Sequence, residues 1–540
     1  MRRPGESTVV CKLPRRISLA VGLLLFALPG AEAEAAPRPN IVLIMADDMG
    51  YSDIGCYGGE IRTPNLDRLA AGGLRSSQFY NCAVCGTSRA SLMTGLYHHQ
   101  VGITGWTGLL NRRCVTVVEL LKQAGYSTHV VGRLDMTTAD TWHDPQQIAR
   151  YVDHFLGSTG HTGPGNYFKA VRGSPFWQDG KPFDLPPEGT YKTDLITDYA
   201  VKCITEAAGQ EKPFFLYVSH YAPHWPLHAK PEDVARYRDT YADVGWDELR
   251  KRRYRRLVEL GLIDAAWKLS PRDPRVPPWQ NAQHKPWEAE RMAVYAAQID
   301  CLDQSVGRVL EAIRQAGVEQ NTLVLFLSDN GPSDQAWGRA LDRPGEPWRL
   351  DGTPTRCGNS PDIMPGGPDV FVTYGPPWAN VSNTPFRRYK GTNYEGGIAT
   401  PMVAYWPEVI KQRGEVTHQV GHIMDITATC LDIAGVEYPS GFQGRDVLPL
   451  EGKSLLPILQ GREREGHDVL CWNLHGNRAV RMGNWKLVAL KGKPWELYDL
   501  KTDRTETNDL AEEQPDRVRR MAAAYQAWAE RCGVGTEGRP

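Results

Sequence analysis

The chain has 540 residues, of which 41% are hydrophobic and 23% charged, and its formal net charge is −1 at pH 7. This length and composition are typical of a large globular core with a second, smaller domain. The near-zero net charge argues against bulk electrostatic attraction to nucleic acid or to an anionic membrane. We therefore expect no nucleic-acid partner.

The first 35 residues predict a signal peptide. Arg15 and Arg16 precede an apolar run over 17–28, and a string of small residues over 31–36 follows. This order is typical of a secretory signal, and the apolar run is too short to span a bilayer. We expect an exported protein, periplasmic or extracellular, with no membrane-spanning segment in the mature chain.

Two short apolar runs that are far apart in the chain each end in acidic or amide side chains. The runs cover 40–46 and 322–327, and the side chains beyond them are Asp47, Asp48, Asp329 and Asn330. Such runs are typical of buried parallel strands, and ligands gather beyond the carboxyl ends of strands in α/β sheets. A set of oxygen ligands suits Ca²⁺ or Mg²⁺ rather than zinc or copper. Helix capping or a turn is the alternative for each pair alone.

The thiol of Cys85 precedes the guanidinium of Arg89 by four residues in the stretch NCAVCGTSRASLMTG over 81–95. A predicted helix over 88–96 would direct its N-terminal N–H groups and dipole toward an anion there. A buried cysteine in an apolar segment is the common alternative. Cys82 and Cys85 form one CxxC pair, but no second pair or thioredoxin-like pattern points to a zinc or redox site.

Two more apolar runs, over 127–131 and 213–219, also lead to polar residues, and helical periodicity covers 115–124, 193–208 and 288–316. Strands that alternate with helices predict an α/β fold in which helices sandwich a mostly parallel central sheet.

The later parts of the chain are less uniform. In the charged region over 230–287, a solvated helix face is favoured over a polyanion-binding surface. The Gly- and Pro-rich stretch over 331–378 predicts a long surface insertion at the rim of a cleft. Short alternating strands and a helix over 515–531 predict a smaller α+β domain with an antiparallel sheet. The expected divisions are 1–35, 36–465 and 466–540.

Several ordered segments together carry a family resemblance. They are RPNIVLIMADDMG over 38–50, TPNLD over 63–67, SRASLMTG over 88–95, APHWP over 222–226, LSDNG over 327–331, and Lys390 with EGG over 395–397. With these segments the chain resembles the formylglycine-dependent sulfatases of the alkaline phosphatase superfamily, specifically the arylsulfatase-like branch. The resemblance covers nearly the whole mature chain.

The resemblance implies hydrolysis of a sulfate ester, either an aryl sulfate or a sulfated carbohydrate. A maturation enzyme would oxidise Cys85 to formylglycine, whose hydrate supplies one hydroxyl as nucleophile and keeps a second to expel sulfate. Calcium, or less favourably Mg²⁺, would be bound by the modified Cys85 with Asp47, Asp48, Asp329 and Asn330. Metal and cations would neutralise the sulfuryl oxygens. The implied catalytic residues are Cys85, Arg89, Arg133, His224 and Lys390, with Arg89 steadying the nucleophile and His224 and Lys390 contacting substrate.

Two positions depart from the family pattern. Thr87 stands where the modification motif Cys-x-Pro/Ala-x-Arg has proline or alanine, which bears on recognition by the maturation enzyme. The family usually has Gly-Lys-Trp-His at 132–135, where Arg133 here keeps the positive charge and Asp135 replaces a proton donor with an anion. Two alternatives follow: an impaired sulfatase-like protein that binds an anionic ligand without turnover, and a phosphoester or phosphonate hydrolase of the same superfamily.

Overall fold

The computed structural model describes residues 9–11, 38–106, 108–135, 137–138, 151–158, 166–169, 176–185, 189–336 and 355–535. The chain divides into two units, Met1–Pro37 and Arg38–Pro540, and the elements below belong to the second. Apart from residues 9–11, the predicted signal peptide lies outside the described residues. Within the described ranges, no helix is long and apolar enough to cross a membrane.

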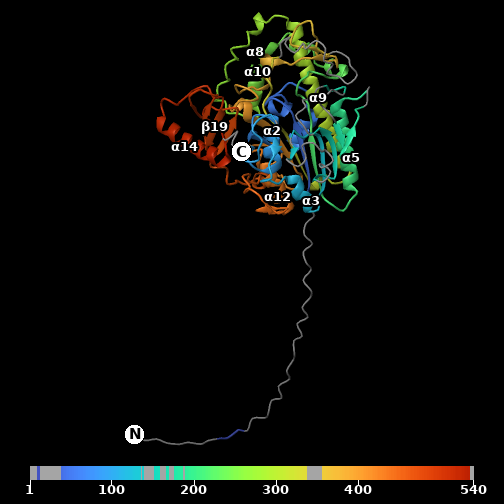
Figure 1. The fold of residues 1–540 in the computed structure, drawn as a ribbon, viewed down its shortest axis with the longest axis vertical. Coiled ribbons are helices and arrows are strands. Elements are labelled where there is room, and N and C mark those ends of the chain that lie inside the picture. The colour runs from blue at the N-terminus through green and yellow to red at the C-terminus, as the bar shows by residue number, and fades with distance from the viewer. Residues whose placement is uncertain are drawn as a thin grey trace. The chain divides into compact units, whose positions relative to one another are not determined.

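An eleven-stranded sheet runs through the described part of the second unit (Figure 1). Its order is β14-β2-β13-β10-β1-β9-β4-β6-β7-β8, with β15 also paired to β2. The five strands from β10 to β6 are parallel, and antiparallel pairs flank them. The strands are β1 (Asn40–Ala46), β2 (Leu74–Tyr80), β4 (Ser127–Arg133), β6 (His154–Ser158), β7 (Phe176–Gln178), β8 (Lys181–Phe183), β9 (Phe214–Ser219), β10 (Thr322–Ser328), β13 (Ala399–Tyr405), β14 (Glu415–Thr417) and β15 (Gly421–His422).

Strand β1 shows why the central strands of the sheet have apolar residues at successive positions. Its side chains alternate between two separate cores: Val42 and Ile44 belong to one, Leu43 and Met45 to the other. A strand that is buried on both faces needs apolar residues at every position. The predicted strands over 40–46 and 322–327 are therefore confirmed.

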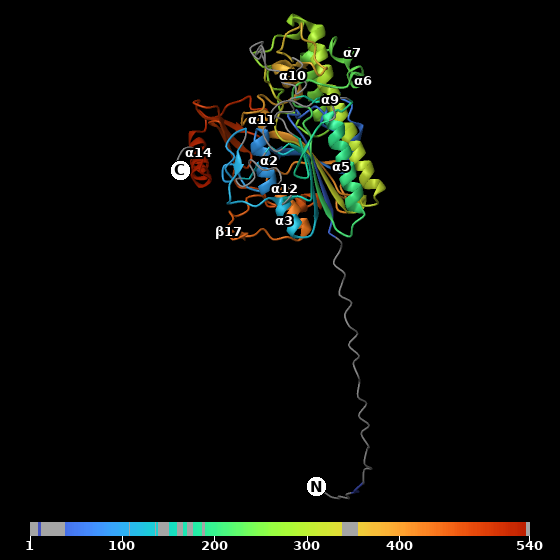
Figure 2. The same ribbon diagram turned by 45° about the vertical axis from the view of Figure 1, so that its right-hand side comes forward.

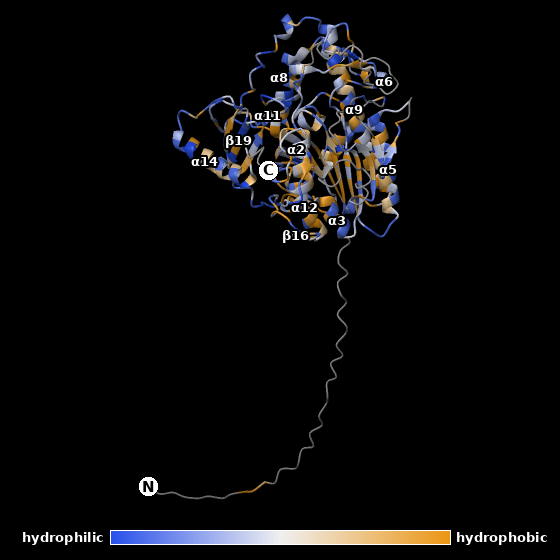
Figure 3. Cartoon of the chain, in the orientation of Figure 1, coloured by the Kyte–Doolittle hydropathy of each residue, from blue (hydrophilic) through white to orange (hydrophobic). Residues whose placement is uncertain are grey.

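Helices cover both faces of the sheet (Figure 2). Helices α5 and α9 pack against each other on one face, and α2, α3 and α12 pack together on the other. Figure 3 shows the hydrophobic strands between these layers. The helices are α1 (Pro64–Gly72), α2 (Cys85–Thr94), α3 (Val117–Gln123), α5 (Lys192–Ala208), α6 (Pro231–Val234), α7 (Arg238–Tyr241), α8 (Gly245–Glu259), α9 (Lys285–Gln315), α10 (Gly375–Ser382), α11 (Glu395–Ile398), α12 (Asp425–Ala434), α13 (Leu456–Leu459) and α14 (Pro515–Cys532). The predicted α/β fold with a mostly parallel sheet is confirmed.

A smaller antiparallel sheet lies near the C-terminus. It has the order β18-β19-β20-β21, and α14 packs on β19 and β20. Its strands are β18 (Leu470–Leu474), β19 (Asn477–Met482), β20 (Trp485–Ala489) and β21 (Glu496–Asp499). A fully buried ion pair connects this smaller sheet to α11. Lys486 Nζ of β20 lies 2.9 Å from Glu395 Oε1 at the start of that helix. The domain boundary at residue 466 stays a prediction.

Two expectations need correction, and one needs refinement. Helix α2 begins at Cys85 rather than at residue 88, so the thiol belongs to the first helical residue. The basic helix α8 has an exposed face with Arg252, Arg255 and Arg256, but its arginines are not all on that face: Arg253 is buried and pairs with Asp53 over 2.7 Å. The stretch over 331–378 is not wholly a surface insertion: residues 337–354 lie outside the described residues, but Trp378 in α10 is fully buried.

Short elements complete the described structure. They are β3 (Leu109–Leu110), β5 (Thr137–Thr138), β11 (Arg356–Cys357), β12 (Val370–Phe371), β16 (Gly441–Phe442) and β17 (Arg445–Asp446), with 3-10 turns at Gly55–Tyr57, Trp279–Asn281 and Glu319–Asn321.

Candidate active site

The carboxyl ends of four central strands meet at one edge of the sheet. Ala46 of β1 pairs with Ser328 of β10, while Ser219 of β9 pairs with Met45 of β1 and with Gly132 of β4. Parallel strands that are aligned in this way present the residues after them to a common space. The residues placed there are Asp47 and Asp48 after β1, Asp329 and Asn330 after β10, His224 after β9, and Arg133 and Asp135 at the end of β4.

The acidic residues after β1 and β10 contact each other. The Asp48 N–H donates to Asp329 Oδ1 over 3.2 Å, and Asn330 Nδ2 donates to Asp48 Oδ1 over 2.6 Å. Asp48 itself has a φ of 66°, a left-handed conformation that is strained for a non-glycine residue. Such strain is often found at functional sites.

Three buried oxygens of this group lack a hydrogen-bond donor among the described residues. They are Asp47 Oδ1, Asp48 Oδ2 and Asn330 Oδ1. A buried acceptor without a partner costs about 1–3 kcal/mol, and more when it is charged. A hard cation would satisfy oxygens of this kind, so the residues fit a calcium or magnesium ion.

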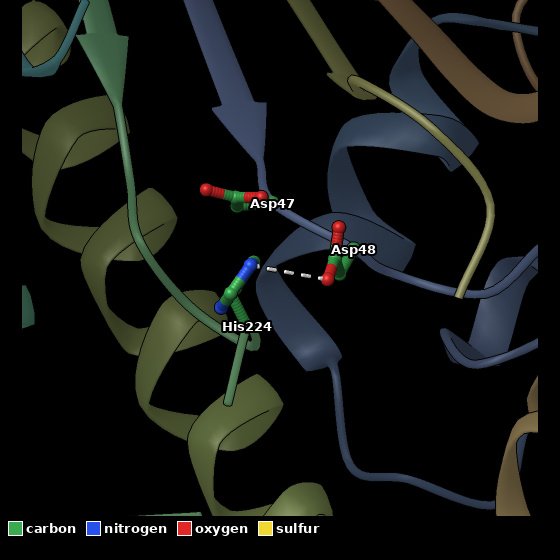
Figure 4. Close-up of side chains that lie close together, drawn as sticks. All are labelled: Asp47, Asp48 and His224. Atoms are coloured by element: carbon green, nitrogen blue, oxygen red, sulfur yellow. Dashed lines mark ion pairs between the residues drawn. The ribbon is translucent and has the colours of Figure 1, made fainter. Parts of the chain in front are cut away.

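His224 lies beside these carboxylates (Figure 4). Its Nε2 is 3.4 Å from Asp48 Oδ2, and ligand atoms of Asp47, Asp48 and His224 all lie within 4.8 Å of one another. Its Nδ1 lies 2.7 Å from the carbonyl oxygen of Trp225, which assigns the ring proton to Nδ1. Burial lowers the pKa of His224 to about 4, so the ring is neutral at pH 7 and presents the Nε2 lone pair to the site.

Arg89 and Lys390 bring positive charge to the carboxylates. Arg89 Nη2 lies 2.8 Å from Asp329 Oδ2 and 3.5 Å from Asp47 Oδ2. The Lys390 ammonium pairs with Asp48 Oδ1. Burial acts to raise the pKa of Asp47, but the charge of Arg133, aided by Arg89, holds it below its usual range. Burial and the nearby Asp47 raise the pKa of Asp329.

Arg133 connects the nucleophile position with the acidic group. Its Nη2 donates to Cys85 Sγ over 3.3 Å, and its Nη1 contacts Asp47 Oδ2. The Asp135 carboxylate faces the same guanidinium with both oxygens: Oδ1 lies 2.8 Å from Nε, and Oδ2 lies 2.7 Å from Nη2. Gly132, with a φ of 102°, lets the end of β4 lie close to β9, because a Cβ there would lie 1.9 Å from the Ser219 carbonyl oxygen.

The charges of the described site do not balance. Four carboxylates face three permanent cations, namely Asp47, Asp48, Asp135 and Asp329 against Arg89, Arg133 and Lys390. When all four carboxyl groups are ionised, the excess is one negative charge, which opposes the binding of an anion. Burial, together with this excess, raises the pKa of Asp329. A bound divalent cation would convert the negative excess into an excess of one positive charge.

Cys85 is fully buried at the start of α2. Burial raises the pKa of its thiol well above the usual value, even though Arg133 acts in the opposite direction. The thiol is therefore protonated at neutral pH and is a poor nucleophile in this form. Cys85 and Cys82 are both unpaired, so the CxxC pair is not a disulfide. Thr87 directs its hydroxyl to the carbonyl oxygens of Cys82 and Val84.

Three residues that sequence reasoning did not single out support the site. Arg89 Nη1 donates to Tyr217 Oη over 3.2 Å and to Ser219 Oγ on β9. Tyr217 and Ser219 are two positions apart in the otherwise apolar strand β9, so they lie on the same face of it. That spacing is a signal in the sequence that could have identified them. The ring of Trp106 lies 5.5 Å from Lys390 Nζ. Trp106 stands in a stretch without periodicity, so no sequence signal marked it.

Comparisons with known proteins place the chain in one family. The sulfatase family model matches residues 39–436, and a model described as N-sulphoglucosamine sulphohydrolase, C-terminal, matches residues 388–524. An uncharacterized sulfatase of Schizosaccharomyces pombe is 32% identical over 92% of this chain and 95% of its own length. The arylsulfatase of Klebsiella aerogenes is 31% identical over 83% of this chain and 97% of its own length.

A solved structure also shares the fold. It is a protein in complex with its substrate D-glucosamine-2-N,6-O-disulfate, with a TM-score of 0.63 and 22% identity over 93% of this chain and 100% of the other. At this identity the likeness concerns the fold alone. The family-model match and the two relatives together show that this chain belongs to the sulfatase family of sulfuric ester hydrolases.

Proposed function

We propose that the chain hydrolyses aryl sulfates or sulfated carbohydrates through a formylglycine derived from Cys85, with Ca²⁺ bound beside it. One observation carries the proposal: a protonated, buried Cys85 contacts Arg133, which in turn contacts Asp47. Asp47 belongs to a group in which two carboxylate oxygens and one amide oxygen lack a hydrogen-bond donor among the described residues. The Klebsiella arylsulfatase supports an aryl sulfate as substrate. The disulfated glucosamine of the fold neighbour is the reason for testing sulfated carbohydrates as well.

Asp47, Asp48, Asp329 and Asn330 are the proposed calcium ligands, together with the modified Cys85. Calcium is favoured over Mg²⁺ because it accepts many oxygen ligands in irregular geometry, whereas Mg²⁺ demands a near-ideal octahedron. When bound, the cation would neutralise charge on the sulfuryl oxygens. His224 Nε2 lies close enough to Asp48 to contact either the cation or the substrate.

The cationic side chains would then bind and orient the ester. Arg133 directs an N–H at Cys85 Sγ, which marks the position of the future nucleophilic oxygen. The hydrated aldehyde would supply that oxygen and retain a second hydroxyl for release of sulfate. Arg89 fixes Asp329 and the backbone carbonyl of Arg133, to which its Nη1 donates over 2.8 Å. Lys390, which pairs with Asp48, would contact a sulfuryl oxygen.

A maturation enzyme is the proposed partner. Because the Cys85 side chain is fully buried and already helical, its conversion would precede folding. The maturation enzyme would then recognise Thr87 in the unfolded chain, before its hydroxyl donates to the carbonyl oxygen of Cys82. We also propose export to the periplasm or the extracellular space through the segment 1–35.

Mass spectrometry of the Cys85 peptide after coexpression with a maturation enzyme tests the proposal. We expect formylglycine, together with turnover of 4-nitrophenyl sulfate that exceeds turnover of 4-nitrophenyl phosphate. Cys85→Ala should abolish turnover, whereas Cys82→Ala, a matched control at a buried thiol that contacts Ser91, should retain it. A wholly unmodified thiol in active protein would overturn the formylglycine route. Faster phosphate cleavage would instead favour the phosphoester hydrolase.

A second candidate, an impaired sulfatase-like protein, is favoured by one observation. Asp135 accepts the Nε–H of Arg133 and pairs with its Nη2, so it neutralises a guanidinium charge that would otherwise be available to an anion. This candidate predicts formylglycine without turnover, and a gain of turnover in Asp135→His. Turnover by the unaltered, modified protein would exclude it.

A further inference from the structure

We infer that the C-terminal sheet holds Lys390 in the active site, with Asn477 as the positioning residue. The inference rests on the proposed function only for the contact between Lys390 and a sulfuryl oxygen of the substrate. The β18–β19 turn, residues 474–477, carries Asn477 and contacts the segment 390–393 directly. In Figure 3, β19 lies beside α11, which follows that segment.

Asn477 bonds the Lys390 segment in both directions. Its Nδ2 donates to the carbonyl oxygen of Gly391 over 2.8 Å, and its own carbonyl oxygen accepts from Asn393 Nδ2 over 2.9 Å. Its Oδ1 accepts from the N–H of Lys491 over 3.0 Å. The side chain is thereby fixed to the sheet at one end and to the Lys390 segment at the other.

The same segment is bonded to two loops of the active site. The Lys390 N–H donates to the carbonyl oxygen of Pro332 over 3.1 Å, in the loop after β10. The Gly391 N–H donates to the carbonyl oxygen of Ala83 over 2.9 Å, just before α2. Gly391 has a φ of 83°, which glycine adopts without steric cost. Gly391 therefore links the two parts: its carbonyl oxygen accepts from Asn477, and its N–H donates to Ala83, two residues before Cys85.

A second contact runs through aromatic rings. His475 and Gly476 have φ values of 52° and 87°, as in a two-residue I′ turn. The turn presents His475 to Trp106, with ring centroids 5.9 Å apart and an interplanar angle of 31°. The Trp106 ring in turn lies 5.5 Å from Lys390 Nζ, within the range of a cation–π contact.

The position of the Lys390 ammonium therefore depends on the C-terminal sheet. A lysine carries its charge on a flexible four-carbon stem, so its backbone must be fixed for the ammonium to meet a sulfuryl oxygen. Asn477→Ala removes the side-chain bonds with Gly391 and Lys491, of which only the first touches the Lys390 segment, and leaves the backbone bonds of β19 in place. We expect a loss of about tenfold in kcat/KM, the equivalent of one hydrogen bond.

Hydrogen–deuterium exchange of the full-length protein tests the contact without any need for turnover. Asn477→Ala should speed exchange of the Lys390 and Gly391 amides. Asn473→Ala is the matched control, because Asn473 Nδ2 bonds Tyr525 Oη in the same sheet over 2.7 Å, and its 387–394 peptide should exchange as in the wild type. If Asn477→Ala does not fold, Asn477→Asp retains the Lys491 bond and serves instead. Unchanged exchange in the folded variant would overturn the inference.

Kinetics on 4-nitrophenyl sulfate then separate positioning from general stability. In a Lys390→Ala background, Asn477→Ala should have no further effect on kcat/KM, because its effect passes through Lys390. A further tenfold loss in that background would overturn the role of Asn477. If the wild type shows no turnover at all, the proposed function fails, while the exchange result still decides the contact.

Discussion

Asp135→Asn tests how the Arg133 guanidinium is held beside Cys85. Asp135 Oδ1 accepts a hydrogen bond from Arg133 Nε over 2.8 Å, and Oδ2 lies 2.7 Å from Nη2 in a fully buried ion pair. Asparagine keeps one acceptor oxygen and turns an amino group toward Nη2, so the ion-pair contact there becomes a contact between two donors. Asp47 remains as the other partner of Arg133.

The cost can be worked out from these contacts. Removing one partner of a buried ion pair destabilises a protein by about 3–5 kcal/mol. The remaining contact with Asp47 places this variant at the lower end, at about 3 kcal/mol. The unit Arg38–Pro540 has roughly 500 residues, and an unfolding entropy of about 2.1 cal/mol/K per residue makes 1 kcal/mol equivalent to about 1 °C. We therefore expect a Tm about 3 °C below that of the wild type.

Differential scanning calorimetry at pH 7 measures this shift. Asp153→Asn is the matched control, because Asp153 pairs with Lys122 over 3.0 Å at a partly exposed position. Pairs of that kind contribute about 0–1 kcal/mol, so the control should lose no more than about 1 °C. A loss in Asp135→Asn no greater than in the control would refute the view that Asp135 holds Arg133.

Three further predictions concern the ion, Arg89 and the pH. Chelation by EGTA should lower Tm, and Ca²⁺ should restore it more than equal Mg²⁺, since a ligand at 100 times its Kd stabilises by about 2.7 kcal/mol. Arg89→Lys should lower both Tm and kcat, because an ammonium cannot reproduce the two N–H contacts with Asp329 together with those on β9. Burial lowers the pKa of His422 to about 3, so below pH 6.5 the unfolded chain binds a proton that the folded chain does not. As the pH falls from 6.5, His422 alone should lower the free energy of unfolding by up to about 1.4 kcal/mol per pH unit, beside the other buried histidines. In His422→Gln this fall should be smaller.

For each of these three predictions, one measured outcome would contradict it. Equal recovery of Tm with both ions would count against calcium as the preferred ion. A wild-type kcat in Arg89→Lys would show that the guanidinium fork is dispensable. A Tm profile of His422→Gln between pH 6.5 and 4 that parallels the wild type would mean that His422 does not carry the acid sensitivity. Calorimetry across the pH series decides the last case.

The sequence was most informative where one local pattern had one structural outcome. The run over 41–46 is apolar at every position because β1 is buried on both faces, and the acidic residues after it follow the strand end directly. The same logic located Asp329 and Asn330 after β10. The family resemblance then assigned roles to Cys85 and Arg89, and the family itself is confirmed. The individual roles stay predictions.

Tertiary structure decided what depends on partners far away in the chain. The sequence identified Asp135 as an anion near a sulfate site, but only the fold shows it forked onto Arg133. A basic run predicted a solvated helix face, but the run does not show that Arg253 lies on the opposite side, where Asp53, 200 residues away, offers a buried carboxylate. Asn477 meets the Lys390 segment across 86 positions. Sequence patterns record periodicity along the chain, whereas such pairs exist only once the sheet and its loops have packed.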